Sequence, residues 1–113
     1  MKNKRLYVVI PCYNEEEVLK ETSKRLNVKL GELIKDKIIS KDSKVLFVND
    51  GSKDKTWDII CELNKKNKLF SGINLSRNGG HQNALVAGLM TAKEYADVVI
   101  SMDADLQDDI NAL

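Results

Sequence analysis

Four short apolar runs divide the chain, and each of them ends abruptly in polar residues. Runs of this kind, rich in β-branched and aromatic side chains, are typical of strands buried on both faces of a parallel sheet. We therefore predict four strands, which cover residues 6–10, 45–48, 69–75 and 95–102.

Between these runs, apolar residues recur every three or four positions, which is the spacing of one face of an α-helix. Three helices are predicted: a long one after residue 14, a second around Trp57, Ile60 and Cys61, and a third built from small residues between 84 and 92. The apolar stripe of the first helix consists of Val18, Leu19, Thr22, Leu26, Leu30, Leu33 and Ile34.

Residues suited to helix caps precede the first two helices. Asn14 is expected to cap the first helix, with Glu17 reaching back toward it as in a capping box. Ser52 or Asp54 is expected to cap the second helix, after a sharp turn that Gly51 permits.

The alternation of strands and helices predicts an α/β fold, namely a Rossmann-like, doubly wound and mostly parallel sheet with right-handed crossovers. We place the first strand centrally, the fourth strand beside it, and the second and third strands on its other side. The winding then reverses between the first and fourth strands, and ligands bind at the carboxyl ends of strands at such a reversal. This arrangement gathers residues 11–15, 49–50 and 103–105 in one crevice.

Composition narrows the class of protein. The chain has 113 residues and a formal net charge of +1, so one domain covering residues 1–113 is expected, without the basic excess of a nucleic-acid binder. Cys12 and Cys61 are too few for a disulfide framework, which favours packed thiols in a reducing compartment. No apolar segment approaches the ~20 residues of a transmembrane helix.

Two carboxylates follow the fourth strand, and they are candidate metal ligands. Side chains at i and i+2 of an extended segment point the same way, so Asp103 and Asp105 can face one cation with their Cα atoms ~6.5 Å apart. Mg²⁺ and Mn²⁺ take oxygen ligands of this kind and keep positions open for substrate phosphates. An Asp-x-Asp triplet alone is a weak signal, and its setting has to support it. No Gly-x-Gly-x-x-Gly follows the first strand, so a nicotinamide dinucleotide site is not expected.

Four segments together resemble a known family. Val-Val-Ile-Pro-Cys-Tyr-Asn-Glu (8–15), Val-Asn-Asp-Gly-Ser-Lys-Asp-Lys-Thr (48–56) and Met-Asp-Ala-Asp-Leu-Gln-Asp (102–108) look like the signatures of family 2 inverting glycosyltransferases, which have the GT-A fold. With the segment 75–88, containing Arg-Asn-Gly-Gly-His-Gln-Asn, the chain is most similar to the polyprenyl-phosphate branch, such as dolichol-phosphate mannosyltransferase and bactoprenol glucosyltransferases.

The resemblance implies a nucleotide-sugar donor, a UDP- or GDP-sugar, and assigns roles to single residues. It implies that Pro11, Tyr13 and Glu15 border the nucleoside and that Asp50 accepts a hydrogen bond from the base edge. A Tyr ring can cover a base, and carboxylates can accept from ribose hydroxyls or an imino N–H.

The resemblance also implies a metal site at the end of the fourth strand. Asp103, Asp105 and Gln107 would lie around Mg²⁺ or Mn²⁺ and the diphosphate, and Asp105 and Gln107 are the expected direct ligands. Ala104 lies within this motif and is counted with the donor-binding residues. The metal would act as a Lewis acid on the leaving group, whose charge grows as the anomeric carbon is attacked from the opposite face.

Other residues of the site have alternatives. Arg77 approaches phosphate or simply caps a strand end, and His81 is assigned a structural hydrogen bond rather than the role of catalytic base. Gly79 replaces an aromatic residue that is frequent in the family, so we expect a more flexible loop there.

The resemblance further implies that the acceptor-binding half and the general base follow Leu113, so the chain is expected to be the N-terminal, donor-binding part of the enzyme. The acceptor would be a polyprenyl phosphate for cell-envelope glycans, and the whole protein would lie in the cytoplasm at the inner face of the membrane. Because the fourth strand would then be an exposed edge, homo-oligomers are expected.

Other classes of protein were weighed against this one. A noncatalytic nucleotide-binding module or inactive fragment stays open. A phosphatase of the haloacid dehalogenase type carries its Asp-x-Asp pair after the first strand, whereas here it follows the fourth. A receiver-like signalling domain would need acids after the first strand, where this chain has Pro11, Cys12 and Tyr13.

Overall fold

The computed structural model describes residues 3–75 and 80–104, and the predicted alternation of strands and helices is confirmed. Each of the four strands corresponds to a predicted strand, and the three helices connect them. In chain order the elements are β1 (Leu6–Cys12), α1 (Glu16–Lys35), β2 (Lys44–Asp50), α2 (Thr56–Lys66), β3 (Phe70–Leu75), α3 (His81–Lys93) and β4 (Val98–Ser101).

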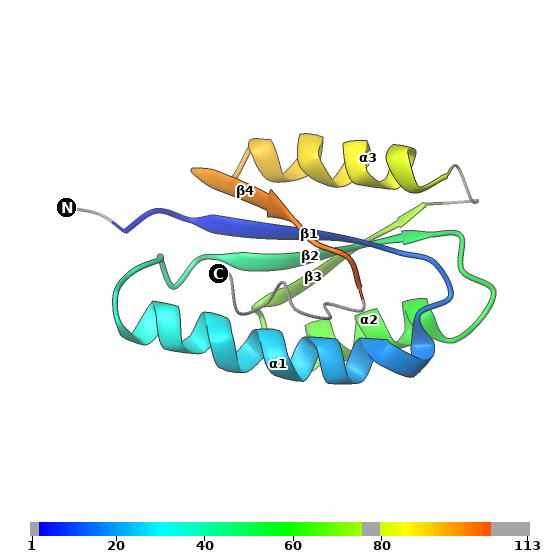
Figure 1. Cartoon of the computed structure of the whole chain (residues 1–113), viewed down its shortest axis with the longest axis horizontal. Coiled ribbons are helices and arrows are strands. Elements are labelled where there is room, and N and C mark those ends of the chain that lie inside the picture. Colours follow the sequence, from blue (N-terminus) through cyan, green and yellow to red (C-terminus); the bar gives the residue numbers. More distant parts are fainter. Residues whose placement is uncertain (1–2, 76–79, 105–113) are drawn as a thin grey trace.

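The strands form one parallel sheet in the order β3-β2-β1-β4, as predicted. Cys12 pairs with Asn49 of β2, and Val9 pairs with Ser101 of β4, so β1 is the central strand at the point where the winding reverses. Figure 1 shows the strands running side by side in this order, with their carboxyl ends toward the right.

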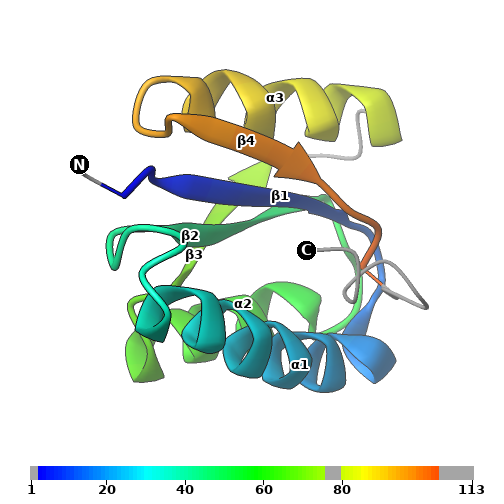
Figure 2. The same ribbon diagram turned by 60° about the vertical axis from the view of Figure 1, so that its left-hand side comes forward.

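Helices cover both faces of the sheet, with α3 on one face and α1 and α2 on the other (Figures 1 and 2). The α1 stripe predicted from the sequence is buried at Leu19, Thr22, Leu26 and Leu30. The three leucines belong to one core together with alternate residues of β1. Val9, Leu46 and Val48 belong to a second core beneath α3. Alternation along each strand thus assigns every strand residue to one face.

The third helix approaches the sheet closely, as its small residues predict. A Cβ added at Gly88 would overlap the Val9 side chain and lie 2.9 Å from Cγ2 of Val48. Only a residue without a side chain therefore fits between α3 and the two central strands.

Each strand differs from its predicted range at one or both ends, and the differences at the end of β1 and the start of β4 have a clear local cause. The strand β1 continues through Pro11 to Cys12, because Pro11 lies beyond the last β1–β4 pair and its missing N–H removes no hydrogen bond to β4. The strand β4 begins at Val98 rather than 95, because the N–H groups of Tyr95 and Ala96 both donate to the Ala92 carbonyl in a turn that directly follows α3.

Candidate functional site

Three polar turns meet at the carboxyl edge of the sheet, after β1, β2 and β4. Since β1 lies between β2 and β4, residues at the ends of these strands are on adjacent strands, which are spaced ~4.8 Å apart. Pro11, Asp50 and Asp103 therefore share one edge. The strand order thus agrees with the predicted gathering of these residues at one edge, and that they line one crevice stays a prediction.

These three residues also share one face of the sheet. Pro11 alternates with Ile10 and Cys12, which belong to the core on the α1 side, and Asp50 continues the alternation of Leu46 and Val48, which lie on the α3 side. Beyond β4, Met102 and Ala104 are buried on the α1 side and the exposed Asp103 lies between them. The α3 face of the edge is thus where the predicted donor-binding groups converge.

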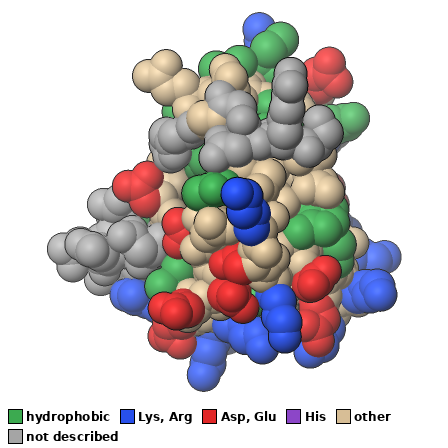
Figure 3. Space-filling model, turned by 90° about the vertical axis from the view of Figure 1, so that its right-hand side faces the viewer, with side chains coloured by type: hydrophobic (Ala, Val, Ile, Leu, Met, Phe, Trp, Pro, Cys, Tyr) green, Lys and Arg blue, Asp and Glu red, His purple; other side chains and the backbone are tan. Residues whose placement is uncertain are grey.

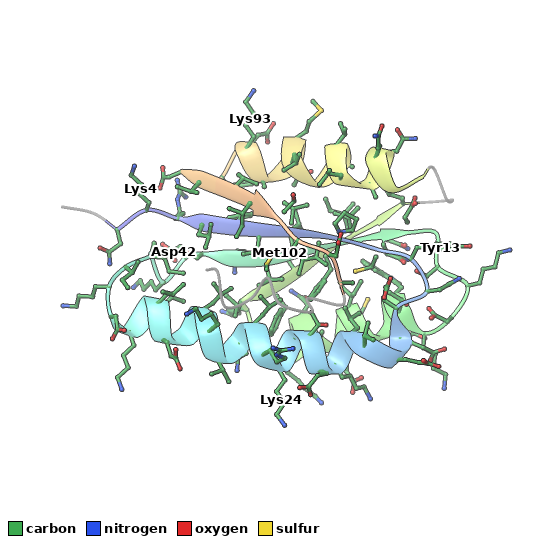
Figure 4. All side chains as sticks on the ribbon, viewed as in Figure 1. Lys4, Tyr13, Lys24, Asp42, Lys93 and Met102 are labelled. Atoms are coloured by element: carbon green, nitrogen blue, oxygen red, sulfur yellow. The ribbon has the colours of Figure 1, made fainter. Side chains whose placement is uncertain are left out.

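The predicted residues differ in how far solvent reaches them. Pro11 is buried, Asp50 is only 3% exposed, and Tyr13 is 40% exposed. Figure 4 shows Tyr13 projecting from the turn after β1, at the end of the molecule opposite Lys4 and Asp42. A ligand at this edge can therefore lie against the Tyr13 ring, whereas it reaches only a small part of the Asp50 carboxylate.

The main chain around Asp103 is firmly anchored. The Met102 N–H donates to the Val9 carbonyl over 3.1 Å, and the Thr22 hydroxyl of α1 donates to the Ala104 carbonyl. The Ala104 side chain, 4% exposed, packs in the core, so it offers a ligand no surface. The buried neighbours on both sides hold the exposed Asp103 at the edge.

Several predicted residues lie outside the described part of the chain. These are Arg77, Gly79, Asp105 and Gln107. His81 begins α3, but its side chain is also outside the description. Among residues 3–75 and 80–104, no group of three or more His, Cys, Asp or Glu side chains is placed to hold a metal ion. Asp103 is the one predicted metal ligand that the described residues contain.

Hydrogen bonds join the turn after β1 to the turn after β2. The N–H groups of Asn14, Glu15 and Glu16 donate in succession to Ser52 Oγ (2.9 Å), Thr56 Oγ1 (2.8 Å) and Asp54 Oδ2 (3.2 Å). In return, the Lys53 N–H donates to Asn14 Oδ1 over 2.8 Å. We call this set of four bonds the turn clamp.

The turn clamp corrects the predicted capping of α1. Helix α1 begins at Glu16 without a cap bond from Asn14, and the N–H groups of Glu15 and Glu16 are bound by Thr56 and Asp54 of the other turn. For α2 the structure places the N-cap at Lys55, which makes no side-chain cap bond, but the predicted Asp54 just before it binds the N–H of Thr56, the first residue of that helix, through Oδ1 over 2.9 Å. Gly51, with φ +70°, makes the sharp turn between β2 and this cap.

Two groups beside the site have shifted pKa values. Burial by itself would raise the pKa of Asp54, but hydrogen bonds from Thr56 and from the Glu16 N–H outweigh it and lower the pKa below the ordinary value of 3.8. Burial, and then the negative charge of Glu15, raise the pKa of the Cys12 thiol. Asp54 is thus ionised at neutral pH, while Cys12 is a protonated, packed thiol as predicted.

The two ends of the molecule differ in character. Figure 3 faces the carboxyl edge and shows Asp and Glu side chains across its middle and lower part, together with Lys or Arg side chains near its centre and around the lower rim. A hollow of about 240 Å³ lies away from this edge, between α1 and the start of β2, and its lining includes Lys41, Lys44 and Lys68. None of the predicted site residues that the structure describes lines this hollow.

The residues that sequence reasoning did not connect with the site are Ser52, Asp54 and Thr56. Their spacing, Ser-x-Asp-x-Thr directly after a strand, puts three side-chain acceptors on one turn. That pattern predicts a helix start, but it does not show that these side chains also bind N–H groups at and just before the start of α1.

Comparison with known proteins gives a consistent result. The sequence model described as "Glycosyl transferase family 2" matches residues 7–113. The chain is 54% identical over 108 residues to the "Uncharacterized glycosyltransferase YkoT" of Bacillus subtilis, covering 96% of this chain and 32% of that protein. It is 37% identical over 109 residues to the "Prophage bactoprenol glucosyl transferase homolog" of Escherichia coli, covering 96% of this chain and 33% of that protein.

A solved structure shows the same fold. The mannosyltransferase PcManGT from Pyrobaculum calidifontis, in complex with GDP-Man and Mn²⁺, superposes with a TM-score of 0.75 at 22% identity. The match covers 91% of this chain and 28% of that one. The chain thus spans about a third of the length of the curated relatives it matches.

Proposed function

Since the chain belongs to glycosyl transferase family 2, we propose that it forms the donor-binding part of an enzyme that transfers a sugar from a nucleoside diphosphate to a polyprenyl phosphate, with inversion at the anomeric carbon. One observation supports the proposal above the others. Pro11 in β1, Asp50 at the end of β2 and Asp103, two residues past β4, come from three separate motifs and lie at the carboxyl ends of adjacent strands, on one face by strand alternation. A donor bound there would touch all three motifs.

The proposed roles follow the chemistry of each side chain. The exposed Tyr13 ring would cover the base, and the Glu15 carboxylate would accept from the ribose hydroxyls. Asp50, at the buried end of β2, would accept an N–H of the base edge through the part of its carboxylate that solvent reaches. Pro11 would give the proposed donor site a rigid apolar wall, and Arg77 would approach the diphosphate.

A divalent cation fits the metal ligands that we propose. Asp103 is an exposed carboxylate on an anchored main chain, and carboxylate and amide oxygens suit Mg²⁺ or Mn²⁺. Asp105 and Gln107 would complete the protein's share of the ligands. When bound, such an ion neutralises charge that develops on the leaving diphosphate.

The proposed acceptor and cellular location are argued from similarity to a relative. Similarity to the prophage bactoprenol glucosyl transferase homolog supports a polyprenyl phosphate acceptor and hence work at the inner face of the cell membrane. No helix within the described residues has the length and apolar character needed to cross a membrane. We propose that the acceptor is held by parts of the protein other than these 113 residues.

Titration calorimetry with GDP and UDP tests the donor site. We expect one of the two to bind more tightly with Mn²⁺ than with a chelator, and we expect Asp105→Asn to remove most of that difference. Asp42→Asn is the matched control, because Asp42 is exposed at the opposite end of the molecule. Equal affinity with and without metal would contradict the proposed metal site, and no binding of either nucleotide would contradict the proposed donor site.

A further inference from the structure

The turn that carries Tyr13 and Glu15 is held from outside its own sequence. Three successive N–H groups, those of Asn14, Glu15 and Glu16, are bound by side chains of the β2–α2 turn, which lies 38 to 41 residues further along the chain. The first N–H groups of a helix have no partner inside the helix. Here Asp54 supplies the partner for the N–H of Glu16, the first residue of α1, and Thr56 and Ser52 bind the two N–H groups just before the helix.

Asp54 is the centre of this arrangement because its two oxygens serve different helices. Oδ2 accepts the Glu16 N–H at the start of α1, and Oδ1 accepts both the N–H and the hydroxyl of Thr56 at the start of α2. Thr56 is fully buried and passes the link on, because its hydroxyl oxygen also accepts the Glu15 N–H. One carboxylate therefore sets the relative position of two turns.

Asn14 shows that the turn depends on this support. Its φ of +52° lies in the left-handed region, which residues with a side chain adopt rarely. Its main chain and its side chain are both held by the other turn: its N–H donates to Ser52 Oγ, and its side-chain Oδ1 accepts the Lys53 N–H. Tyr13 and Glu15 flank this residue, so a change at Asn14 would redirect both side chains.

We infer that Ser52, Asp54 and Thr56 are positioning residues for the donor nucleoside, because the turn clamp fixes the direction in which Tyr13 and Glu15 present their side chains. This inference rests on the proposed function, since it concerns the same donor site. It adds a role for the segment 48–56. Asp50 of that segment would contact the nucleotide, whereas Ser52, Asp54 and Thr56 would hold the segment 8–15 in place.

Single substitutions can remove one bond of the turn clamp at a time. Ser52→Ala removes the acceptor of the Asn14 N–H, and Ser52→Thr restores a hydroxyl at the same place. Asp54→Asn keeps one oxygen for Thr56 and loses the second acceptor, the one that serves Glu16. Asp58→Asn is the control for charge, because Asp58 is exposed in the first turn of α2.

The readout is the affinity of the full chain for GDP and UDP, measured by calorimetry with Mn²⁺ and with a chelator, beside the melting temperature of each variant. Ser52→Ala and Asp54→Asn are expected to weaken nucleotide binding about five- to tenfold, in line with the loss of one hydrogen bond. The ratio of the affinities with and without Mn²⁺ should stay unchanged, because the clamp lies on the nucleoside side. Ser52→Thr and Asp58→Asn should bind like the original chain.

The outcomes separate this inference from the proposed function. Variants that melt earlier but bind nucleotide as tightly as the original chain would show that the clamp is merely structural, and they would overturn the inference alone. If the original chain binds neither nucleotide, the donor site itself is refuted and the inference with it. Should Asp54→Asn fail to fold, the Ser52→Ala and Ser52→Thr pair decides the question.

Discussion

Gly88 and Gly31 both lie inside helices, but only Gly88 meets the sheet. A Cβ at Gly88 would overlap Val9 and crowd Val48, whereas a Cβ at Gly31 of α1 would have no atom within 4 Å. Glycine in a helix costs ~1 kcal/mol relative to alanine, so an added methyl helps wherever there is room. The same substitution should therefore have opposite signs at the two positions.

We expect Gly31→Ala to stabilise the chain by ~0.5–1 kcal/mol and Gly88→Ala to destabilise it, because overpacking costs ~1–3 kcal/mol and exceeds the gain in helix propensity. Urea denaturation of both variants measures the free energies of unfolding. A Gly88→Ala variant as stable as Gly31→Ala would mean that α3 can move away from β1 and β2 without cost.

Asp54 gives a prediction for the dependence of stability on pH. Its pKa in the folded chain is lower than its ordinary value of 3.8, so folding favours the ionised form. The stabilisation by the carboxylate is then fully present above the unfolded pKa, and it is lost as the pH falls through the lower folded pKa.

The difference in unfolding free energy between the original chain and Asp54→Asn should accordingly be constant above about pH 5 and shrink below about pH 4. Urea denaturation at pH 6, 4 and 3 measures it. Asp58→Asn provides the comparison for a surface carboxylate. A difference that does not change with pH would argue against the ionised oxygens as the source of the stabilisation.

At the scale of single elements, β4 stands out because it is a short edge strand. Val98 is 40% exposed, and β4 pairs with β1 on one side only within the described residues (Figure 1). The free backbone groups of such an edge can pair with another chain. This is the physical basis for the homo-oligomers expected from the sequence.

We therefore expect dimers or larger assemblies in size-exclusion chromatography with light scattering. Val98→Lys should shift the chain toward the monomer, because an inserted charge opposes edge-to-edge pairing. Val86→Lys is the matched control, since Val86 is 52% exposed on α3 and lies away from the strand edge. A monomeric original chain, or equal effects of the two lysines, would contradict pairing through β4.

At the scale of the whole molecule, the residues proposed to bind the donor lie at one edge of the sheet, while the curated relatives are about three times as long as this chain. We predict that these 113 residues bind nucleotide but do not transfer sugar to a lipid phosphate. Positioning an acceptor in line with the reacting carbon can supply ~7–11 kcal/mol of the barrier, and the proposed roles here all concern the donor.

The measurement is a transfer assay with radiolabelled nucleotide sugars and polyprenyl phosphate. It compares this chain with a version extended through the rest of its gene. We expect product only from the extended protein. Turnover by the 113 residues at a comparable rate would show that acceptor binding and the general base already lie within them.

The sequence alone determined the order and type of the elements and the edge at which the site lies. Continuous apolar runs and helical stripes depend on neighbours a few residues away, and the reversal of winding follows from the rules of parallel sheets. The order β3-β2-β1-β4 was therefore predictable, and so was the sharing of one edge by Pro11, Asp50 and Asp103.

Only the tertiary structure decided which groups support the site. Local pattern made Asn14 the cap of the next helix, but the oxygens that bind the start of α1 come from Asp54 and Thr56, about 40 residues away. In this case the backbone N–H groups take acceptors that packing of the whole chain brings near, and the sequence around those N–H groups holds no record of them.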